Sequence, residues 1–439
     1  MVSGAEPLQP EKFDAIVVGA GLAGISSAYL MAKAGLKVAV IERGDFAGAK
    51  NVMGGILYTQ PTEQVFPGFY KQAPLERPII EQSAWLLSTG SAMKVGHRSE
   101  AFAQEPCNCY TVLRARFDKW LAQQAVAAGA LVVPSTLVEG VTRQDGKVVG
   151  VRTGREQGEL LADVVIAADG VNSILARDAG LHQEFKESEL ALVVKEIVAL
   201  PAEKIEDRFN LAPGQGASIE LYGDSTAGML GTGFIYTNKD SLSVGVGTLI
   251  SEYVRTLSTP YDLLERMKSH PMIKPLLEGG EPREYMAHLI PEGGFRAIPQ
   301  LFTDGMLVAG DAAQFCNGLH REGSNFALVS GKLAAETVIE AKAKGDFSAR
   351  SLSSYGRRVN DSFIAKDLRK YCHASHYMER HPALLTVYPD MVNAAAREFL
   401  TVDSVPKREK QWKIFREIRG RRSLFTMARE LLGLLRVVK

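Results

Sequence analysis

A glycine-rich turn near the start of the chain constrains the fold more than any other feature. Residues 13–19 (FDAIVVG) are rich in Ile and Val, which is typical of a strand buried on both faces. A glycine turn and a helical pattern follow through Gly35, and a second strand pattern (LKVAVIER) spans 36–43. Together they form a βαβ unit. The chain is therefore expected to adopt an α/β fold with a parallel sheet.

The residues of this turn have the types that a dinucleotide requires. Gly19 permits the tight turn, Gly21 lets the backbone approach a pyrophosphate, and Gly24 allows the helix to pack closely on the strand. The N–H groups at the helix start, around Leu22 and Ala23, then face the phosphates. A tight turn without a ligand is the alternative.

An acidic residue at the end of the second strand supports the dinucleotide. Glu42, followed by Arg43, can accept hydrogen bonds from the adenosine ribose hydroxyls. The alternative of a turn without a ligand leaves this glutamate unexplained. We expect Arg43 and Val138 among the cofactor contacts.

A second motif nearly three hundred residues later favours FAD over NAD. Gly310 and Asp311 end an apolar strand (MLVAGDAA), where an aspartate can bond a ribityl hydroxyl of a flavin that runs across the sheet. The alternative is an Asp that caps the following helix. A second glycine fingerprint for NAD is missing, because GQG (214–216), GTG (231–233) and GVG (245–247) do not open strand–helix units. FAD is the expected cofactor.

A strong helical pattern begins near Ser324. If its N-terminus points at the pyrimidine edge of the flavin, its partial positive charge favours the anionic reduced flavin. Gly323, Ser324 and Asn325 would supply close backbone approach and capping.

The pattern changes between about 184 and 290, where alternating segments such as ASIELYG and SLSVGVGTLI indicate antiparallel sheet. We expect a glutathione-reductase-type FAD-binding Rossmann domain interrupted by an antiparallel-sheet cap domain, with a helical C-terminal region. The expected parts are a disordered lead (1–11), the FAD-binding domain (12–75, 106–183 and 291–345), the cap or quinone-substrate domain (76–105 and 184–290), and the helical region with a basic amphipathic tail (346–439).

Composition excludes several classes of protein. The chain has 51 Lys+Arg and 50 Asp+Glu, so no overall field recruits nucleic acid. The N-terminus lacks the features of a signal peptide, and no uncharged apolar stretch is long enough to span a membrane. The four cysteines (107, 109, 316 and 372) are too few for a disulfide framework and suit a reducing cytoplasm. They also lack the C-x2-C-x2-C spacing of an iron–sulfur cluster.

Two of the cysteine positions leave alternatives open. Cys107 and Cys109 could ligate a metal, but two thiolates without a nearby His are more often structural. Cys316 could modulate redox chemistry or could be a small buried filler. No metal site is expected.

The C-terminal tail is basic. Residues 406–439 carry eleven Lys/Arg against three Glu, and apolar residues from 424 to 438 follow helical spacing. A basic amphipathic helix can lie on an anionic bilayer, dock an acidic partner protein, or pack within the chain.

Several motifs of the chain occur in the order that a known flavoprotein superfamily shows. VVGAGLAGISSAYLMAKAGLKVAVIER, GAKNVMGGILY (48–58), LRARFDKWL (113–121), IAADGVNS (166–173) and LVAGDAA (307–313) resemble the geranylgeranyl-reductase-like flavoprotein superfamily. Within it, GFIYTNKDSLSVGVG (233–247) and REGSNFALVSGKLAAE (321–336) resemble the electron-transfer-flavoprotein:quinone oxidoreductases of the FixC type. The resemblance covers residues 12–375.

The resemblance implies roles for individual residues. Gly54 and Gly55 bring the chain close to the flavin, Arg114 lies near the diphosphate or ribityl chain, and Asp169 and Gly170 close a loop over the adenosine side. Gly310 and Asp311 hold the ribityl chain, and residues 321–325, beginning with Arg321, line the isoalloxazine. Each charged residue has an alternative. Arg114 could be a solvated helix-start cation, Asp169 a turn former, and Arg321 a surface ion-pair partner.

The resemblance also implies a function. Reduced electron-transfer flavoprotein (alpha and beta subunits) would pass electrons to FAD, and a membrane quinone (menaquinone or ubiquinone) would receive them. An iron–sulfur cluster would sit on a separate small ferredoxin-like partner, and the chain would lie on the inner face of the cell membrane. No catalytic side chain is identified.

Other functions remain as alternatives. A geranylgeranyl or prenyl-lipid reductase is weakened because the stretch around Tyr222 lacks the Tyr-x-Trp-x-Phe-Pro pattern of such enzymes. A non-catalytic relay subunit of an electron-bifurcating assembly is the third candidate, and an aromatic hydroxylase is a distant fourth.

Overall fold

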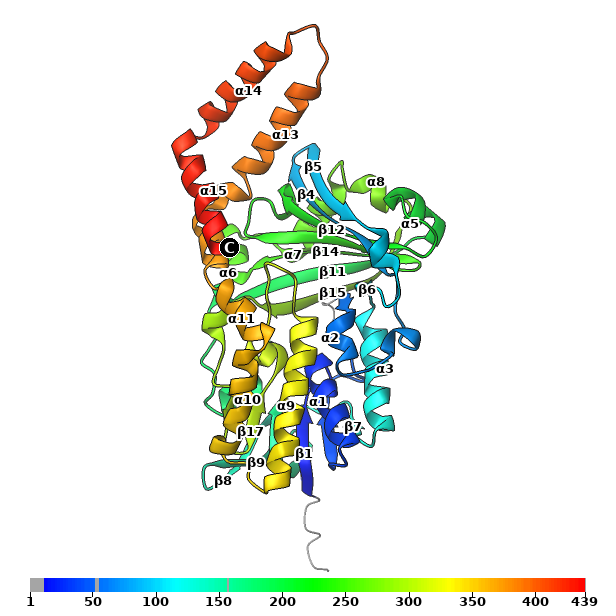
Figure 1. Cartoon of the computed structure of the whole chain (residues 1–439), viewed down its shortest axis with the longest axis vertical. Helices are drawn as coiled ribbons and strands as arrows, with labels where there is room; N and C mark the ends of the chain where they lie inside the picture. The colour runs from blue at the N-terminus through cyan, green and yellow to red at the C-terminus, as the bar shows by residue number, and fades with distance from the viewer. Residues whose placement is uncertain (1–11, 52–54, 156–157, 439) are drawn as a thin grey trace, which may run out of the picture.

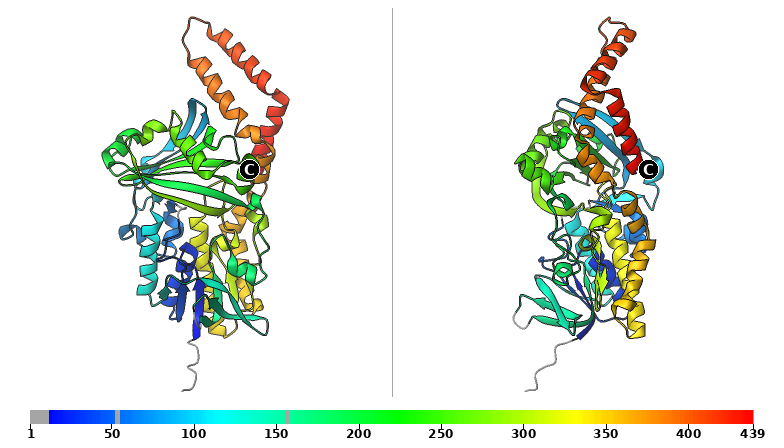
Figure 2. Two further views of the ribbon diagram at one scale, coloured as in Figure 1. Left: turned by 180° about the vertical axis from the view of Figure 1, so that it is seen from behind. Right: turned by 90° about the vertical axis from the view of Figure 1, so that its left-hand side faces the viewer.

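Two β-sheets lie one above the other in the computed structural model, which describes residues 12–51, 55–155 and 158–438 (Figure 1). The lead 1–11 and Gly54 lie outside the described residues. Helices of the C-terminal region run along one side of both sheets and extend beyond the upper one (Figure 2).

The lower sheet has eight strands and a mainly parallel core. Its central order is β16-β17-β10-β1-β2-β7, with β9 also paired to β10 and β8 to β9. On β1, Val17 pairs in parallel with Val40 of β2 and Ile166 of β10. The strands are β1 (Lys12–Val18), β2 (Val38–Ile41), β7 (Leu131–Val133), β8 (Val138–Gln144), β9 (Lys147–Thr153), β10 (Glu159–Ala167), β16 (Phe302–Thr303) and β17 (Met306–Val308). The predicted parallel sheet is confirmed.

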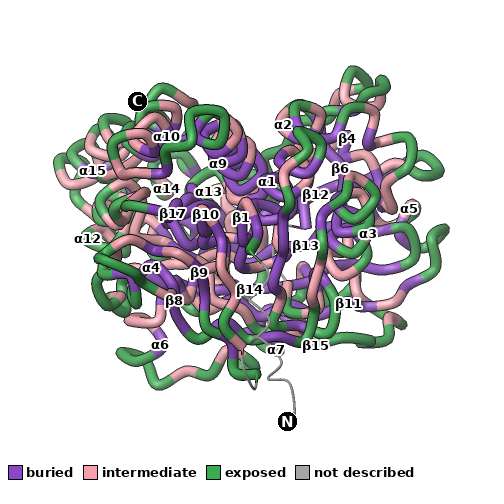
Figure 3. Tube along the Cα trace, turned by 90° about the horizontal axis from the view of Figure 1, so that it is seen from below, coloured by how far each residue is buried: buried purple, intermediate pink, exposed green. Residues whose placement is uncertain are grey.

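Helices cover this sheet and bury it, as a strand rich in Val and Ile requires. From below, the buried segments of β1, β10 and β17 lie inside a rim of exposed loops (Figure 3). Helix α9 packs tightly on α1, because Gly331 of α9 has no side chain: a Cβ there would lie 2.2 Å from the carbonyl oxygen of Ala23. The helices of this part are α1 (Leu22–Lys33), α2 (Thr59–Glu63), α3 (Arg114–Ala127), α4 (Ile174–Asp178) and α9 (Ser324–Lys344).

The upper sheet is the cap. Its seven strands have the order β15-β11-β14-β13-β12-β4-β5 and pair antiparallel except for β4 and β12, which are parallel. The hairpin of β4 and β5 precedes the other strands of this sheet in the sequence and joins the sheet at one edge, beside β12. The strands are β4 (Ile79–Ser88), β5 (Ser91–Arg98), β11 (Leu190–Ala199), β12 (Gly216–Gly223), β13 (Gly231–Thr237), β14 (Ser241–Leu249) and β15 (Glu281–Pro291). A separate two-stranded sheet, β3 (Ile56–Tyr58) with β6 (Cys109–Thr111), packs against the cap sheet.

One face of the cap sheet is buried under its own helices. Side chains of α5 and α7, including Ile205 and Leu264, share an apolar cluster with Leu221, Val244 and Val246 of the sheet. The other face therefore points toward the lower domain. The cap helices are α5 (Ala202–Phe209), α6 (Ile250–Thr256), α7 (Pro260–Ser269) and α8 (Lys274–Leu277).

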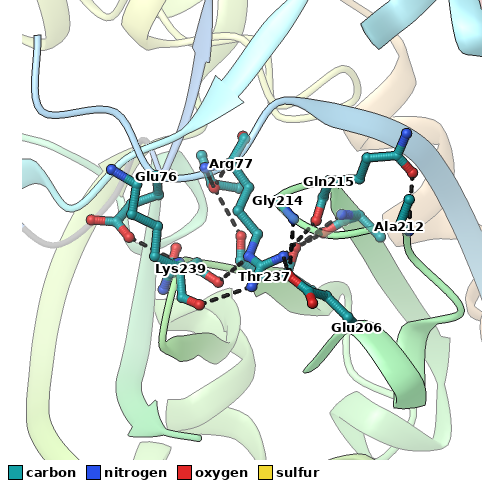
Figure 4. A network of polar contacts seen from close by, with 11 residues as sticks. Glu76, Arg77, Glu206, Ala212, Gly214, Gln215, Thr237 and Lys239 are labelled. Carbon is teal, nitrogen blue, oxygen red and sulfur yellow. Dashed lines mark hydrogen bonds and ion pairs between the residues drawn. The ribbon is translucent and has the colours of Figure 1, made fainter. Parts of the chain in front are cut away.

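A buried arginine fixes the point where the chain enters the cap (Figure 4). Arg77, 2% exposed, donates to the carbonyl oxygens of Asn238, Gln215 and Lys239 at 2.6, 2.9 and 2.8 Å, and pairs with Glu206 at 2.8 Å. One side chain thus joins the start of β4 to two loops and a helix of the cap, which holds the inserted strands against the rest of the sheet.

The C-terminal region is helical, as expected. Helix α10 packs on the lower sheet, where Tyr355 donates to the carbonyl oxygen of Val308 at 2.9 Å. Helices α13 and α14 form a hairpin that projects beyond the cap, and α15 returns toward α12 (Figures 1 and 2). Buried Lys410 closes the hairpin by donating to the Thr401 carbonyl and pairing with Asp403. The helices are α10 (Ala349–Asp361), α11 (Phe363–Lys370), α12 (Ala374–Arg380), α13 (Val387–Leu400), α14 (Lys407–Arg421) and α15 (Leu424–Val438).

None of the helices in the described ranges is both long and apolar enough to cross a bilayer. The domain boundaries given above remain a proposal.

Candidate functional site

A cavity of about 410 Å³ lies between the two sheets. Its lower wall includes the carboxyl ends of β1 and β2 and the glycine turn, and its upper wall is the inner face of the cap. A crevice at the carboxyl ends of parallel strands is where ligands bind in open α/β sheets. The expected site residues that line it are Gly19, Gly21, Leu22, Ala23, Glu42, Arg43, Gly55, Arg114, Val138, Asp169, Gly170, Asp311, Arg321, Gly323 and Ser324.

The three fingerprint glycines have different surroundings. Gly19 has φ +100°, and a Cβ there would lie 2.2 Å from the Ala168 carbonyl oxygen. A Cβ at Gly24 would lie 1.9 Å from the Gly19 carbonyl oxygen, so Gly24 serves helix–strand packing and does not line the cavity. At Gly21, the contact within 4 Å would be Asn51 Nδ2, at 3.8 Å. Gly21 therefore leaves space for a ligand.

Glu42 is held in place by the turn itself. Its Oε2 accepts from the backbone N–H of Ala20 at 2.8 Å, and its Oε1 accepts from that of Gly44 at 2.6 Å. Each carboxylate oxygen has a second lone pair for a ligand hydroxyl. Arg43 and Val138 line the cavity with it.

Two half-buried aspartates, Asp169 and Asp311, border the cavity. Asp169 accepts from the Leu175 N–H at 3.0 Å through Oδ2, while its Oδ1 is buried without a partner. It is therefore both a turn former and a cavity residue. Burial raises the pKa of Asp169 to about 6, and burial raises the pKa of Asp311 to about 6 although Arg114 opposes this shift. A ligand rich in hydroxyls would satisfy such acceptors, so these residues fit FAD.

Arg114 is a fixed buried cation. Its side chain is 10% exposed. Its Nε donates to Asp118 Oδ1 at 2.7 Å, and its Nη2 donates to Asp118 Oδ2 at 2.8 Å. Burial lowers the pKa of Arg114, but the charges of Asp118 and Asp311 outweigh burial and raise it. The alternative of a solvated helix-start cation is wrong.

The cap adds two basic side chains that no sequence motif indicated. Lys195 of β11 and His288 of β15 line the cavity. Burial and Arg114 lower the pKa of Lys195 to about 8, with Glu284 opposing the shift. Burial, Arg114 and Arg43 lower the pKa of His288 to about 4, so its imidazole is neutral at pH 7. Strand alternation could have placed Lys195 in the site, because Ala191, Val193 and Lys195 share one face of β11 and all three line the cavity.

Arg321 joins the lower domain to the cap. Its Nη1 pairs with Glu220 Oε1 of β12 at 2.6 Å, and its Nη2 donates to Gln82 Oε1 of β4 at 3.2 Å. Tyr236 of β13 donates to the same Glu220 oxygen at 3.0 Å. Burial raises the pKa of Glu220, and the Arg321 charge opposes this. The alternative of a surface partner for Arg321 is wrong, because Glu220 is buried.

The start of α9 differs from expectation in its capping. Gly323 is the N-cap residue and supplies no side chain, and Ser324 instead donates to the Ile56 carbonyl at 3.1 Å. Asn325 donates to Glu322 at 3.3 Å and does not line the cavity. The predicted capping therefore holds for Gly323, which is the N-cap residue, and is wrong for Ser324 and Asn325. Gly310 also lies off the cavity wall; its φ of +66° forms the turn that places Asp311.

The cysteines do not form a metal site in the parts of the chain that the structure describes, where no three His, Cys, Asp or Glu lie close enough to hold an ion. Cys107 and Cys109 are buried around β6, and Cys316 is buried at the cavity wall. Burial raises the pKa of the Cys316 thiol well above its usual range, as do the charges of Glu292, Asp311 and Glu322.

Family models match two parts of the chain: an FAD binding domain over residues 12–208, and the ETF-QO/FixC family C-terminal domain over residues 374–439. Among solved structures, a geranylgeranyl bacteriochlorophyll reductase-like protein from Thermoplasma acidophilum has a TM-score of 0.72 at 21% identity, and covers 97% of this chain and 99% of its own. A flavin-dependent brominase, Bmp2, has a TM-score of 0.65 at 19% identity, covering 88% and 92%. These two likenesses show the fold.

The fold and the FAD-binding match define an FAD-dependent oxidoreductase. Protein FixC of Azorhizobium caulinodans is 47% identical over 94% of this chain and 96% of its own length. A probable electron transfer flavoprotein-quinone oxidoreductase, YdiS, of Escherichia coli (strain K12) is 42% identical over 91% and 93%. The chain belongs to the ETF-QO/FixC family, and the expected resemblance is confirmed.

Proposed function

We propose that the chain passes electrons from reduced electron-transfer flavoprotein through FAD to a membrane quinone. FAD supplies the redox chemistry, because a bound flavin can take up electrons from one partner and pass them to another. The similarity to YdiS, a probable electron transfer flavoprotein-quinone oxidoreductase, supports both partners.

The apolar part of the cavity wall is the observation that supports a quinone as the electron acceptor. The cap contributes Leu230, Leu249 and Ile290, and the C-terminal region contributes Met378 and Leu385. Apolar walls with few polar groups suit a flat, apolar acceptor such as a quinone ring. The residues proposed to hold FAD are the expected site residues that line the cavity, with the glycine turn and Arg114 on the diphosphate and Asp311 on the ribityl chain.

The test is an anaerobic reoxidation. The purified flavoprotein is reduced with electron-transfer flavoprotein and then mixed with menaquinone or ubiquinone analogues, and the visible flavin absorption is followed. Return of the oxidised spectrum with quinone, and none with geranylgeranyl lipid, is the expected result. Reoxidation by the prenyl lipid alone would favour a prenyl-lipid reductase. Inactivity of the isolated chain, with stoichiometric copurifying flavoprotein subunits, would favour a relay subunit of a bifurcating assembly.

An iron–sulfur cluster on a separate small ferredoxin-like protein completes the proposal. Cys107 and Cys109 are buried on or beside one strand, and Cys316 is buried in the cavity wall. A cluster needs four suitably placed ligands, commonly thiolates. The proposed partner would supply them.

We propose that helix α15 lies on the anionic inner face of the cell membrane. The structure leaves several of its large apolar residues exposed, which argues against packing within the chain as their main role: Leu424 (47%), Phe425 (78%), Leu431 (44%), Leu432 (56%) and Leu435 (59%). Exposed Arg429 and Arg436 accompany them. Apolar residues at helical spacing with flanking cations suit a bilayer surface.

Replacing Leu431 and Leu435 by Asp is expected to release the protein from anionic vesicles. Each leucine side chain that is buried in the bilayer surface contributes about 1.5–3 kcal/mol to the free energy of membrane binding. The loss of both should therefore weaken binding at least about tenfold. Cosedimentation with vesicles of phosphatidylglycerol and phosphatidylcholine measures it. Leu257→Asp is the control, because Leu257 is 88% exposed at the end of α6 in the cap. Equal loss in the control, or no binding by the unaltered protein, would contradict the proposal.

A further inference from the structure

A carboxyl group in the cavity has no role in the function proposed so far. Glu292 directly follows β15, is partly exposed, and lines the cavity between the cap and the loop that leads to α9. Its backbone N–H donates to the Glu189 carbonyl at 2.8 Å, which fixes the end of the strand. Strand alternation places Glu292 on the same face as His288 and Ile290, both of which line the cavity.

The opposite wall is shaped to admit this carboxyl group. Gly318 lies on the loop before α9, and a Cβ at Gly318 would lie 2.1 Å from Glu292 Oε2. The carboxylate therefore rests against bare backbone. On the same loop, Cys316 Sγ would lie 3.6 Å from a Cβ at Gly323, the N-cap residue of α9. Glu292 is thus close to the loop that carries the start of the helix expected to face the flavin.

The surroundings of Glu292 keep it partly protonated at neutral pH. Burial raises its pKa to about 7, and among the residues that the structure describes no cation contributes to this shift. The Cys316 thiol on the loop interacts electrostatically with Glu292, and Asp311 and Glu322 act on Cys316 in turn. His288 shares the cavity-facing side of the strand with Glu292, whereas Glu189 contacts Glu292 through its backbone carbonyl. A carboxyl group with a pKa near ambient pH can both give and regain a proton.

We propose that Glu292 delivers a proton to the electron acceptor that is reduced in this cavity. The proposal rests on the proposed quinone reduction. The quinone takes two electrons from reduced FAD and two protons to become the quinol, and any proton that the reduced flavin gives up is released to water. Protonated Glu292 breaks its O–H bond and gives one of these protons to a quinone oxygen, and the second comes from water. The carboxylate that remains is partly exposed, so water restores its proton.

The test measures quinone-driven reoxidation of the reduced holoprotein against pH. With an excess of a short-chain quinone analogue, the reoxidation rate of the unaltered protein is expected to fall as the pH rises through about 7, because the protonated form of Glu292 disappears. Glu292→Gln cannot donate this proton, so its rate should be at least about tenfold lower at pH 6 and independent of pH. Glu189→Gln is the matched control: this neighbouring acid is 21% exposed and pairs with Lys186, and it should react like the unaltered protein.

Two further measurements separate this role from a structural one. Since the pKa of Glu292 in the folded protein lies above its ordinary value of 4.5, its contribution to stability is present below about pH 4.5 and is lost as the pH rises through about 7. The unfolding temperature of Glu292→Gln should therefore rise relative to the unaltered protein between pH 5 and 8. Gly318→Ala should also slow reoxidation, because the added methyl group displaces an otherwise intact carboxyl group.

The outcomes distinguish the inference from the function on which it rests. If quinone reoxidises the unaltered protein and Glu292→Gln with the same rate and pH profile, the inference is overturned and the proposed function stands. An equal slowing in Glu189→Gln would overturn it too. If quinone does not reoxidise the unaltered protein at all, the proposed function fails.

Discussion

Gly21→Val is expected to give a folded protein that has lost its flavin. The backbone of Gly21 has φ −79° and ψ −174°, which valine adopts without strain. A Cβ there would meet Asn51 Nδ2 at 3.8 Å, an ordinary contact, so the substitution leaves the protein's own packing intact. The added methyl groups instead occupy the space through which a diphosphate reaches the backbone N–H groups at the start of α1.

The expected loss of affinity for FAD is large. A hydrogen bond to a charged group contributes about 1.5–3 kcal/mol, and losing two of them weakens binding at least about a hundredfold. Titration of the apoprotein with FAD measures the affinity, and circular dichroism checks the fold. Gly90→Val is the control, since a Cβ at this hairpin position would have no atom within 4 Å. Flavin retained with unchanged affinity in Gly21→Val would remove the glycine turn from the cofactor site.

Gly24 shows why this test needs the right glycine. A side chain at Gly24 would collide with the backbone of Gly19, at 1.9 Å from its carbonyl oxygen, so Gly24→Val should fail to fold. The sequence motif alone predicts all three glycines as one cofactor signature. The structure separates the glycine that leaves room for the ligand from the two that form the turn and the packing around it.

The lower half of the site could be predicted from the sequence because its signals are local. The glycine turn and Glu42 belong to one βαβ unit, in which strand, turn and helix follow each other directly along the chain. Asp311 at the end of β17 follows the same rule, since all parallel strands end at one edge of the sheet. Arg114 starts a helix at this edge, and the sequence showed its position but not its partner Asp118.

The upper half could not be predicted in the same way. The alternation of side chains along β11 puts Val193 and Lys195 on one face of the strand. The packing of the cap helices on the other face decides that this one lines the cavity. His288 and Glu292 depend on the pairing of β15 with β11, which joins residues about ninety positions apart. Ser324 also has its partner far away: the Ile56 carbonyl lies 268 residues earlier, and no local pattern distinguishes this bond from a helix cap.

Arg321→Met is expected to destabilise the folded protein by about 3 kcal/mol, because it leaves Glu220 buried without its cation. Glu220 is 6% exposed in its side chain, and Tyr236 can offer it one hydrogen bond but no charge. Arg321 has φ +58°, and methionine carries the same strain at this φ, so the change reports the ion pair rather than backbone relief. Denaturant unfolding of the holoprotein measures the free energy of unfolding.

The pair can be separated from general damage by a double-mutant cycle. Glu220→Gln removes the buried charge, so adding it to Arg321→Met should recover a large part of the loss, and the two effects should not be additive. Arg283→Met is the matched control, because Arg283 pairs with Glu281 at 2.8 Å while both side chains are more than half exposed, 64% and 73%. Such a pair contributes about 0–1 kcal/mol. Additive effects of the two substitutions would mean that Arg321 and Glu220 are not coupled.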